Sequence, residues 1–315
     1  MIEAEDLTKY YGTFLAIEDV SFKVDRGEIV GFLGPNGAGK TTAMRILTGF
    51  MPASSGTARV AGYDIQTQSL DVRRRIGYLP ETVPLYKEMT VRAFLRFSAT
   101  IRGMTGRRRE TRIKDVIAIC RIEDYARTPI ARLSKGYRQL VGVAQAILHE
   151  PEVLILDEPT IGIDPRQVVH IRQLIKELGR EHTVILSTHI LPEVSMICER
   201  IIVMDHGRIV AIDLPENLST RLEGGRRYEV EAAGPAEDVV SKLREVRGVV
   251  KVTVEGSGET RLYRVESQPG RDIRDELSSA VVGGGFRLLG LKSQEMSLED
   301  IFLRLTTKEK ETEDA

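Results

Sequence analysis

Cysteine is scarce in this sequence, with only Cys120 and Cys198 among 315 residues. The two are not spaced as metal ligands are, and both lie in expected helices, which argues against a metal site built on cysteine. So few thiols make a reducing cytosol the simplest compartment for the protein.

Long apolar runs are lacking as well. No uninterrupted apolar stretch approaches the length of a membrane span, and the first six residues lack the basic start and apolar stretch of a signal peptide. If the protein works at a membrane, we expect it to work from the surface and through a partner.

An excess of charge of either sign is also missing, because 45 basic and 46 acidic residues leave a formal net charge of −1. This balance argues against a protein that mainly coats nucleic acid, and we expect no nucleic-acid partner. A chain of 315 residues favours two domains, each large enough to bury a core.

The chain is organised around a glycine-rich stretch that fits the phosphate-binding pattern G-x-x-x-x-G-K-[ST]. Its residues are Gly34, Pro35, Asn36, Gly37, Ala38, Gly39, Lys40, Thr41 and Thr42. The flanking residues predict a strand over 28–33 and a helix from residue 43. Glycines let backbone N–H groups converge on phosphate oxygens, and the helix N-terminus adds partial positive charge. We expect Lys40 to contact the β- and γ-phosphates and the Thr41 hydroxyl to bind Mg²⁺.

Two further strands are predicted to end in polar residues. The apolar run 153–156 predicts a strand buried on both faces, and it ends in Asp157 and Glu158. Ligands bind at this carboxyl edge of open α/β sheets, so Asp157 is a candidate for holding Mg²⁺ and Glu158 for orienting or deprotonating a water. The alternative is a solvated strand end. The segment 183–188 brings His189 to the same edge, either as a γ-phosphate sensor or as a structural histidine.

The N-terminal segments 7–11 and 16–22 predict antiparallel strands with a turn at Gly12. Tyr11, just before this turn, either stacks on an adenine ring or packs as an ordinary strand residue. A strand over 76–79 leads to Pro80 and the carboxylate of Glu81.

The stretch from residue 82 to about 150 predicts a helical insert within the α/β core. Its arginine run 107–109 is either a solvated face or a contact for nucleic acid or lipid. Ser134 is a suitable N-cap for the helix that follows, which creates a second anion-binding helix start. Because the chain has only one phosphate loop, this second device is expected to serve a site on another copy of the protein.

Together these motifs resemble, in their usual order over residues 1–220, those of the ATP-binding subunit of an ABC transporter. The resemblance implies an adenine-stacking role for Tyr11, Walker A at 34–42, the Q-loop position for Glu81, the signature at 133–137, Walker B with its catalytic glutamate at Asp157 and Glu158, the D-loop at Asp164, and the switch histidine at His189. It implies that Ser134, Lys135 and Gly136 contact the nucleotide of a second subunit.

The sequence departs from the family pattern at two motifs. Glu81 stands where glutamine is usual and supplies an anionic oxygen that is still expected to contact Mg²⁺ or its water. Lys135 and Tyr137 replace the first glycine and the glutamine of the signature. These departures are expected to alter the kinetics rather than the chemistry. They resemble single-module ATPases of bacterial exporters of the drug, sodium and gliding-motility types, which pair with a separate membrane permease.

The resemblance implies an ATPase that uses ATP and Mg²⁺ and forms a head-to-tail dimer around two ATP molecules. The second half is another copy or a related ATPase, and the partner is an integral-membrane permease at the cytoplasmic face of the inner membrane. The competing hypothesis is a soluble ABC protein of translation or DNA metabolism. Such proteins generally carry two ATPase modules or a long coiled coil, and this chain has one Walker A and no heptad run.

The expected fold is an α/β P-loop ABC ATPase core with an antiparallel β subdomain and the helical insert, followed by a small C-terminal α+β domain at 221–306. After a linker near 223–225, the order β-α-β-β-α-β between residues 228 and 291 fits a ferredoxin-like unit. A capping box predicts an amphipathic helix over 297–305, and the charged tail 307–315 is expected to be disordered. This domain serves either dimer support or regulation.

Overall fold

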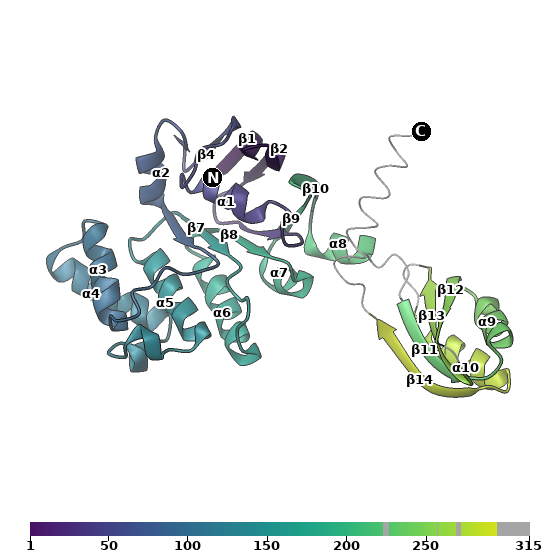
Figure 1. The fold of residues 1–315 in the computed structure, drawn as a ribbon. Helices are drawn as coiled ribbons and strands as arrows, with labels where there is room; N and C mark the ends of the chain where they lie inside the picture. The colour runs from purple at the N-terminus through teal and green to yellow at the C-terminus, as the bar shows by residue number, and fades with distance from the viewer. Residues whose placement is uncertain (223–226, 257, 269–271, 295–315) are drawn as a thin grey trace. The chain divides into compact units, whose positions relative to one another are not determined.

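The computed structural model describes residues 1–222, 227–256, 258–268 and 272–294 (Figure 1). It divides into two compact units, Met1–Pro215 and a second that begins at Glu216, where the sequence placed the boundary near residue 220. Helix α8 (Pro215–Leu222) begins at this boundary, with its first residue in the first unit and the rest in the second. The predicted linker at 223–225, the helix at 297–305 and the tail at 307–315 lie outside the described residues.

The first unit is built on a six-stranded sheet with strand order β10-β9-β3-β8-β7-β6. Five of these strands run parallel, and only the edge strand β10 is antiparallel to its neighbour. The bounds are β3 (Ile29–Leu33), β6 (Ile76–Leu79), β7 (Val153–Asp157), β8 (Thr183–Thr188), β9 (Arg200–Asp205) and β10 (Arg208–Asp213). Every residue of β3, β7 and β8 is buried, as their continuous apolar sequences predict.

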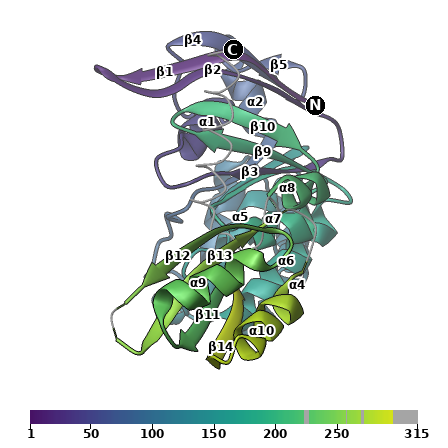
Figure 2. The same ribbon diagram turned by 90° about the vertical axis from the view of Figure 1, so that its right-hand side faces the viewer.

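A four-stranded antiparallel sheet, of order β2-β1-β4-β5, lies above the central sheet with α1 (Lys40–Leu47) between the two (Figures 1 and 2). Its strands are β1 (Ile2–Tyr11), β2 (Phe14–Val24), β4 (Ser55–Val60) and β5 (Tyr63–Asp64). One core cluster joins this sheet, α1 and the central sheet, and within it the rings of Phe22 and Phe32 meet edge to face at 5.1 Å. The phosphate-loop helix is thus anchored on both sides.

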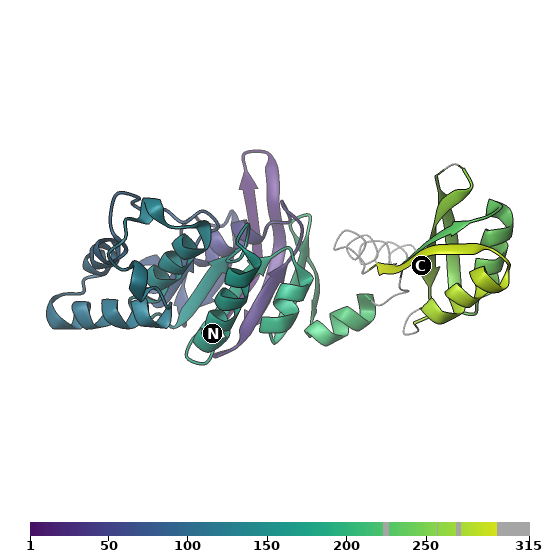
Figure 3. The same cartoon turned by 90° about the horizontal axis from the view of Figure 1, so that it is seen from below.

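Helices α5 (Lys135–Ile147), α6 (Pro165–Leu178) and α7 (Leu191–Ile197) cover the opposite face of the central sheet (Figure 1). Helices α3 (Val91–Ile101) and α4 (Gly106–Ile119) pack on α5 and form the helical insert at one end of this unit (Figure 3). Short 3₁₀ turns at Glu123–Tyr125 and Ile130–Arg132 join them to α5, and α2 (Ser69–Arg75) precedes β6. In the part of the chain that the structure describes, no helix combines the length and apolar character needed to cross a bilayer.

The second unit has the element order β-α-β-β-α-β that the sequence predicts. Its elements are β11 (Arg227–Ala233), α9 (Ala236–Glu245), β12 (Val249–Glu255), β13 (Thr260–Ser267), α10 (Arg274–Gly283) and β14 (Arg287–Gln294). The sheet is antiparallel with order β12-β13-β11-β14, and α9 and α10 share its core with the buried Tyr228 and Tyr263. Helix α10 starts at Arg274, whose amide donates to the carboxylate of Asp272 at 3.2 Å.

Candidate functional site

The phosphate loop connects β3 to α1 with a backbone that requires glycine. Gly37 and Gly39 have φ angles of +85° and +98°, which only glycine adopts readily. A Cβ atom on Gly39 would also lie 2.5 Å from Cγ2 of Ile17 and 2.9 Å from the carbonyl oxygen of Ala16. The loop can therefore turn consecutive N–H groups toward one point at the start of α1, which has no acidic residue in its first turn.

A cavity of about 350 Å³ opens over this loop, within the size range of ligand pockets. It brings together residues from β1, β2, the loop, and the segments that follow β6 and β7. Its lining is Tyr11, Phe14, Ala16, Asn36, Gly37, Ala38, Gly39, Lys40, Thr41, Thr42, Glu81, Glu158 and Ile161. Phe14 and Ile161 are members that the sequence motifs did not indicate.

Lys40 is buried at the base of this cavity. Its Nζ donates to the carbonyl oxygens of Gly34 at 2.7 Å and Pro35 at 3.1 Å, and it lies 3.5 Å from Oε1 of Glu158. Burial lowers the pKa of Lys40, and the carboxylate of Glu158 opposes that shift. The ammonium group is held in place by backbone oxygens and faces the catalytic carboxylate predicted from the sequence.

Asp157 is fully buried at the end of β7. Its Oδ1 accepts hydrogen bonds from Ser187 Oγ at 2.6 Å and from Thr41 Oγ1 at 3.1 Å. Among the described residues, Oδ2 has no hydrogen-bond partner. A buried carboxylate oxygen without a donor, close to a threonine hydroxyl, is chemically suited to a cation.

Glu158 follows in a left-handed backbone conformation with φ of 48°. Its amide donates to Ser187 Oγ at 2.9 Å, and its Oε2 lies 3.0 Å from Nδ1 of His189. Ser187, which the sequence reasoning missed, therefore binds the backbone of Glu158 and the side chain of Asp157 at once. The feature that could have identified Ser187 is its position in the strand, because the parallel register of β7 and β8 pairs it with Asp157.

Tyr11 and Glu81 lie at the rim of the same cavity. Tyr11 is 42% exposed as a whole residue, its hydroxyl is 3.1 Å from Sδ of Met51, and Lys9 Nζ lies 5.8 Å from the ring centre. An aromatic residue with this exposure at the rim of a cavity is a candidate for stacking. Glu81 is also exposed, two residues beyond the end of β6.

Ser134, Lys135, Gly136 and Asp164 are not among the residues that line this cavity. Ser134 caps α5 by accepting from the Tyr137 amide at 3.3 Å, and Asp164 caps α6 by accepting from the Arg166 amide at 2.9 Å. The two helix starts are adjacent, since Nε2 of Gln167 lies 3.4 Å from Ser134 Oγ. The chain thus carries two separate sets of predicted nucleotide-contacting residues.

Comparison with known proteins decides the family. Residues 17–161 match the family model described as ABC transporter. The linearmycin resistance ATP-binding protein LnrL of Bacillus subtilis is 32% identical over 97% of this chain and 98% of its own length. The Nod factor export ATP-binding protein I of Sinorhizobium fredii is 36% identical over 98% of this chain and 86% of its own length. This chain belongs to the ABC transporter family.

A solved structure of an ATP-binding subunit of an ABC transporter is similar in fold. It shares 32% identity with a TM-score of 0.63, and the alignment covers 70% of this chain and 92% of that one. The predicted family, fold class and ATPase activity are thereby confirmed. As an ATP-binding subunit of an ABC transporter, the protein binds and hydrolyses ATP to drive transport. Cassettes of this family dimerise and work with membrane permease subunits.

Proposed function

We propose that two cassettes associate head to tail, so that the phosphate loop of one faces the α5 start of the other across an ATP molecule. The observation that carries this proposal is the separation of the two predicted sets of contacts. The cavity over the loop contains Lys40 and Glu158 but none of Ser134, Lys135 and Gly136. A second copy, or a related ATPase, would supply the missing helix start to each site.

In this arrangement Glu158 is the general base for the attacking water. Its carboxylate is buried and held between Lys40 Nζ at 3.5 Å and His189 Nδ1 at 3.0 Å. His189 orients Glu158 and contacts the γ-phosphate, while Lys40 neutralises charge on the phosphates. Tyr11 stacks on the adenine ring, and Asp164 borders the partner's site.

The residues present also fit Mg²⁺. The unpartnered Oδ2 of Asp157, the hydroxyl of Thr41 and the carboxylate of Glu81 are oxygen donors of the kind Mg²⁺ takes, usually together with water and substrate phosphates. When bound, Mg²⁺ would neutralise the developing charge on the phosphates. Asp157 is positioned for this role through Ser187 and Thr41.

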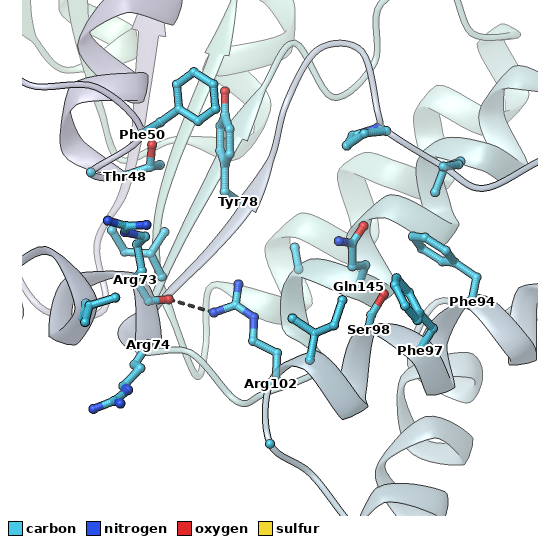
Figure 4. Close-up of a pocket in the computed structure, with 18 of the residues that line it drawn as sticks. Thr48, Phe50, Arg73, Arg74, Tyr78, Phe94, Phe97, Ser98, Arg102 and Gln145 are labelled. Carbon is cyan, nitrogen blue, oxygen red and sulfur yellow. Dashed lines mark hydrogen bonds between the residues drawn. The ribbon is translucent and has the colours of Figure 1, made fainter.

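We further propose that a cytoplasmic helix of the permease docks in a groove of about 1310 Å³ between α2 and α3 (Figure 4). Figure 4 shows Phe94 and Phe97 on one side and Phe50 and Tyr78 on the other. The wall also includes Arg73, Arg74 and Arg102, and Nη1 of Arg102 donates to the Arg73 carbonyl oxygen at 2.8 Å. Aromatic side chains beside guanidinium groups suit a short amphipathic helix that carries a carboxylate.

One short segment connects this groove to the nucleotide cavity. Glu81 lines the nucleotide cavity, whereas Pro84, Leu85 and Tyr86 line the groove. A shift of Glu81 on nucleotide binding would therefore reach the docked helix within a few residues. ATP can drive the permease in this way if it binds the closed dimer more tightly than the open one.

We favour export as the direction of transport. The ATPase would lie at the cytoplasmic face of the inner membrane. The support comes from relatives, which include the Nod factor export protein and the bacitracin transport ATP-binding protein BcrA of Bacillus licheniformis. The transported substrate would be bound by the permease and not by this chain.

The test uses Glu158→Gln, which retains the size of the side chain but removes the base. We expect it to bind ATP, to lose about 10²- to 10⁴-fold in turnover, and to remain as a closed dimer. Tagged Glu158→Gln protein pulled down from native membranes with ATP should bring a multi-span permease with it. Glu181→Gln is the matched control, because Glu181 is exposed and lies shortly before the first residue of β8, at the end of the strand away from the cavity.

Normal turnover by Glu158→Gln would exclude Glu158 as the base. Recovery of ribosomes or DNA-repair proteins without any membrane protein would overturn the permease partner and leave only the ATPase.

A further inference from the structure

A further buried carboxylate, that of Glu193, is bonded to residues next to Glu158 and His189. Glu193, on α7, is only 5% exposed. Its Oε2 accepts hydrogen bonds from Thr160 Oγ1 at 2.6 Å and Thr188 Oγ1 at 3.2 Å, and its Oε1 accepts from Arg172 Nη2 at 2.9 Å. These donors satisfy the charge of a carboxylate that would otherwise be costly to bury.

The two threonines flank the catalytic residues in sequence. Thr160 is two residues after Glu158, and Thr188 immediately precedes His189. The Thr188 hydroxyl also accepts from the amide of Ile190 at 3.1 Å, so the backbone on both sides of His189 is fixed. One carboxylate therefore ties together the two segments whose side chains meet at 3.0 Å in the Glu158–His189 contact.

We propose that Glu193 is a positioning residue for ATP hydrolysis, which holds Glu158 and His189 at their contact distance through Thr160 and Thr188. The proposal rests on the function proposed above, in which Glu158 is the base and His189 orients it. Arg172 links the same carboxylate to α6, the helix that Asp164 caps at the predicted dimer surface.

A carboxylate fits this position because Thr160, Thr188 and Arg172 all donate hydrogen bonds to it. Glutamine has the same length but only one acceptor oxygen. If that oxygen faces the two threonine hydroxyls, the amide NH₂ faces the guanidinium of Arg172, donor against donor. If the amide is reversed, the NH₂ faces Thr160 and Thr188, and their hydroxyl groups lose the oxygen that accepts their hydrogen bonds. We call the hydrogen bonds of Thr160, Thr188 and Arg172 to Glu193 the clamp. Glu193→Gln is thus expected to break the hydrogen bonds on one side of the clamp without leaving a cavity.

The experiment measures ATP hydrolysis and nucleotide affinity on the full-length chain. For Glu193→Gln we expect kcat to fall about 10- to 100-fold, because displacement of catalytic groups by about 1 Å costs this much. The Kd for ATP, measured with a fluorescent analogue, should stay within about threefold, since neither Glu193 nor its hydrogen-bond partners line the cavity. Glu199→Gln is the matched control, because Glu199 is exposed just after the same helix.

The decisive readout is the double-mutant cycle with His189→Ala. If Glu193 acts through the Glu158–His189 contact, Glu193→Gln should cost little in the His189→Ala background, where that contact is already lost. An equal fold-loss in both backgrounds, an unchanged kcat, or a parallel loss of ATP affinity would overturn the proposal. Thr160→Val, which removes one hydrogen bond from the clamp, is the second variant should Glu193→Gln not fold, and the same cycle applies to it.

The outcomes for the two proposals are distinguishable. Wild-type turnover by both Glu158→Gln and His189→Ala would remove the proposed catalytic pair. Impaired turnover in those variants with wild-type turnover in Glu193→Gln would overturn only the positioning role.

Discussion

Replacing Ser187 by alanine should destabilise the first unit more than the loss of one hydroxyl group normally does. The Ser187 side chain is fully buried and serves two groups at once, donating to Asp157 Oδ1 at 2.6 Å and accepting from the Glu158 amide at 2.9 Å. Without it, Asp157 Oδ1 retains only the Thr41 hydroxyl at 3.1 Å, and the Glu158 amide loses its acceptor.

The magnitude follows from these two losses. A hydrogen bond to a buried charged group contributes about 1.5–3 kcal/mol, and a buried N–H left without a partner costs about 1–3 kcal/mol. We therefore expect the free energy of unfolding to fall by about 3 kcal/mol. For a unit of this size that corresponds to a decrease of about 10 °C in Tm.

Thermal melting without nucleotide measures this effect on the first unit. The control is Ser195→Ala, whose hydroxyl donates to the Leu191 carbonyl oxygen at 3.0 Å within α7 and serves no second group. Its Tm should change by only about 2 °C. A decrease for Ser187→Ala no larger than that of the control would show that Asp157 and Glu158 do not depend on this hydroxyl.

Two other regions give contrasting expectations. Burial lowers the pKa of His149 from 6.5 to about 4. As the pH falls below 6.5, the unfolded chain therefore binds a proton before the folded chain does. The free energy of unfolding should be lower by about 3 kcal/mol at pH 4 than at neutral pH. Urea unfolding should show this loss in the wild type and not in His149→Gln, and equal pH slopes would contradict it. Gly39→Ala should abolish ATP binding and lower Tm, because the backbone there is left-handed and the new Cβ would collide with Ile17. Gly136→Ala should retain the fold, since its Cβ would contact mainly the movable end of the Gln167 side chain. Equal effects of the two glycine changes on Tm would refute this distinction.

Much of the site was predictable because it depends on periodicity and on the ends of strands. Continuous apolar runs predict the buried parallel strands, and in such a sheet the residues after β7 and β8 must meet at one edge. Asp157, Glu158 and His189 follow from that rule alone. Ser134 as the cap of α5 follows from its position before an apolar-periodic helix, and the structure shows that cap.

The remainder depends on packing that no local pattern reveals. Helix α7 has seven residues, and it lies so close to β3 that a Cβ on Gly31 would be 2.7 Å from Cγ1 of Val194. The burial of this helix depends on tertiary packing. From the sequence alone, Glu193 is therefore predicted to be an ordinary surface carboxylate. In the sequence, Ser187 is likewise only a polar residue after the apolar run of its strand. Its contact with Asp157 depends on the register of β7 and β8, which no local pattern predicts.

The conformation of Glu158 explains why so many contacts converge on this edge of the sheet. A non-glycine residue in the left-handed region costs about 1–3 kcal/mol and persists only where its surroundings hold it. Here Ser187 binds the amide of Glu158, His189 and Lys40 lie against its carboxylate, and Glu193 anchors the chain two residues later through Thr160. Because each contact holds a different atom of the same short segment, loss of any one should release part of the strain and move the carboxylate. Small changes at buried positions such as Ser187 and Glu193 are therefore expected to reduce turnover before they reduce ATP binding.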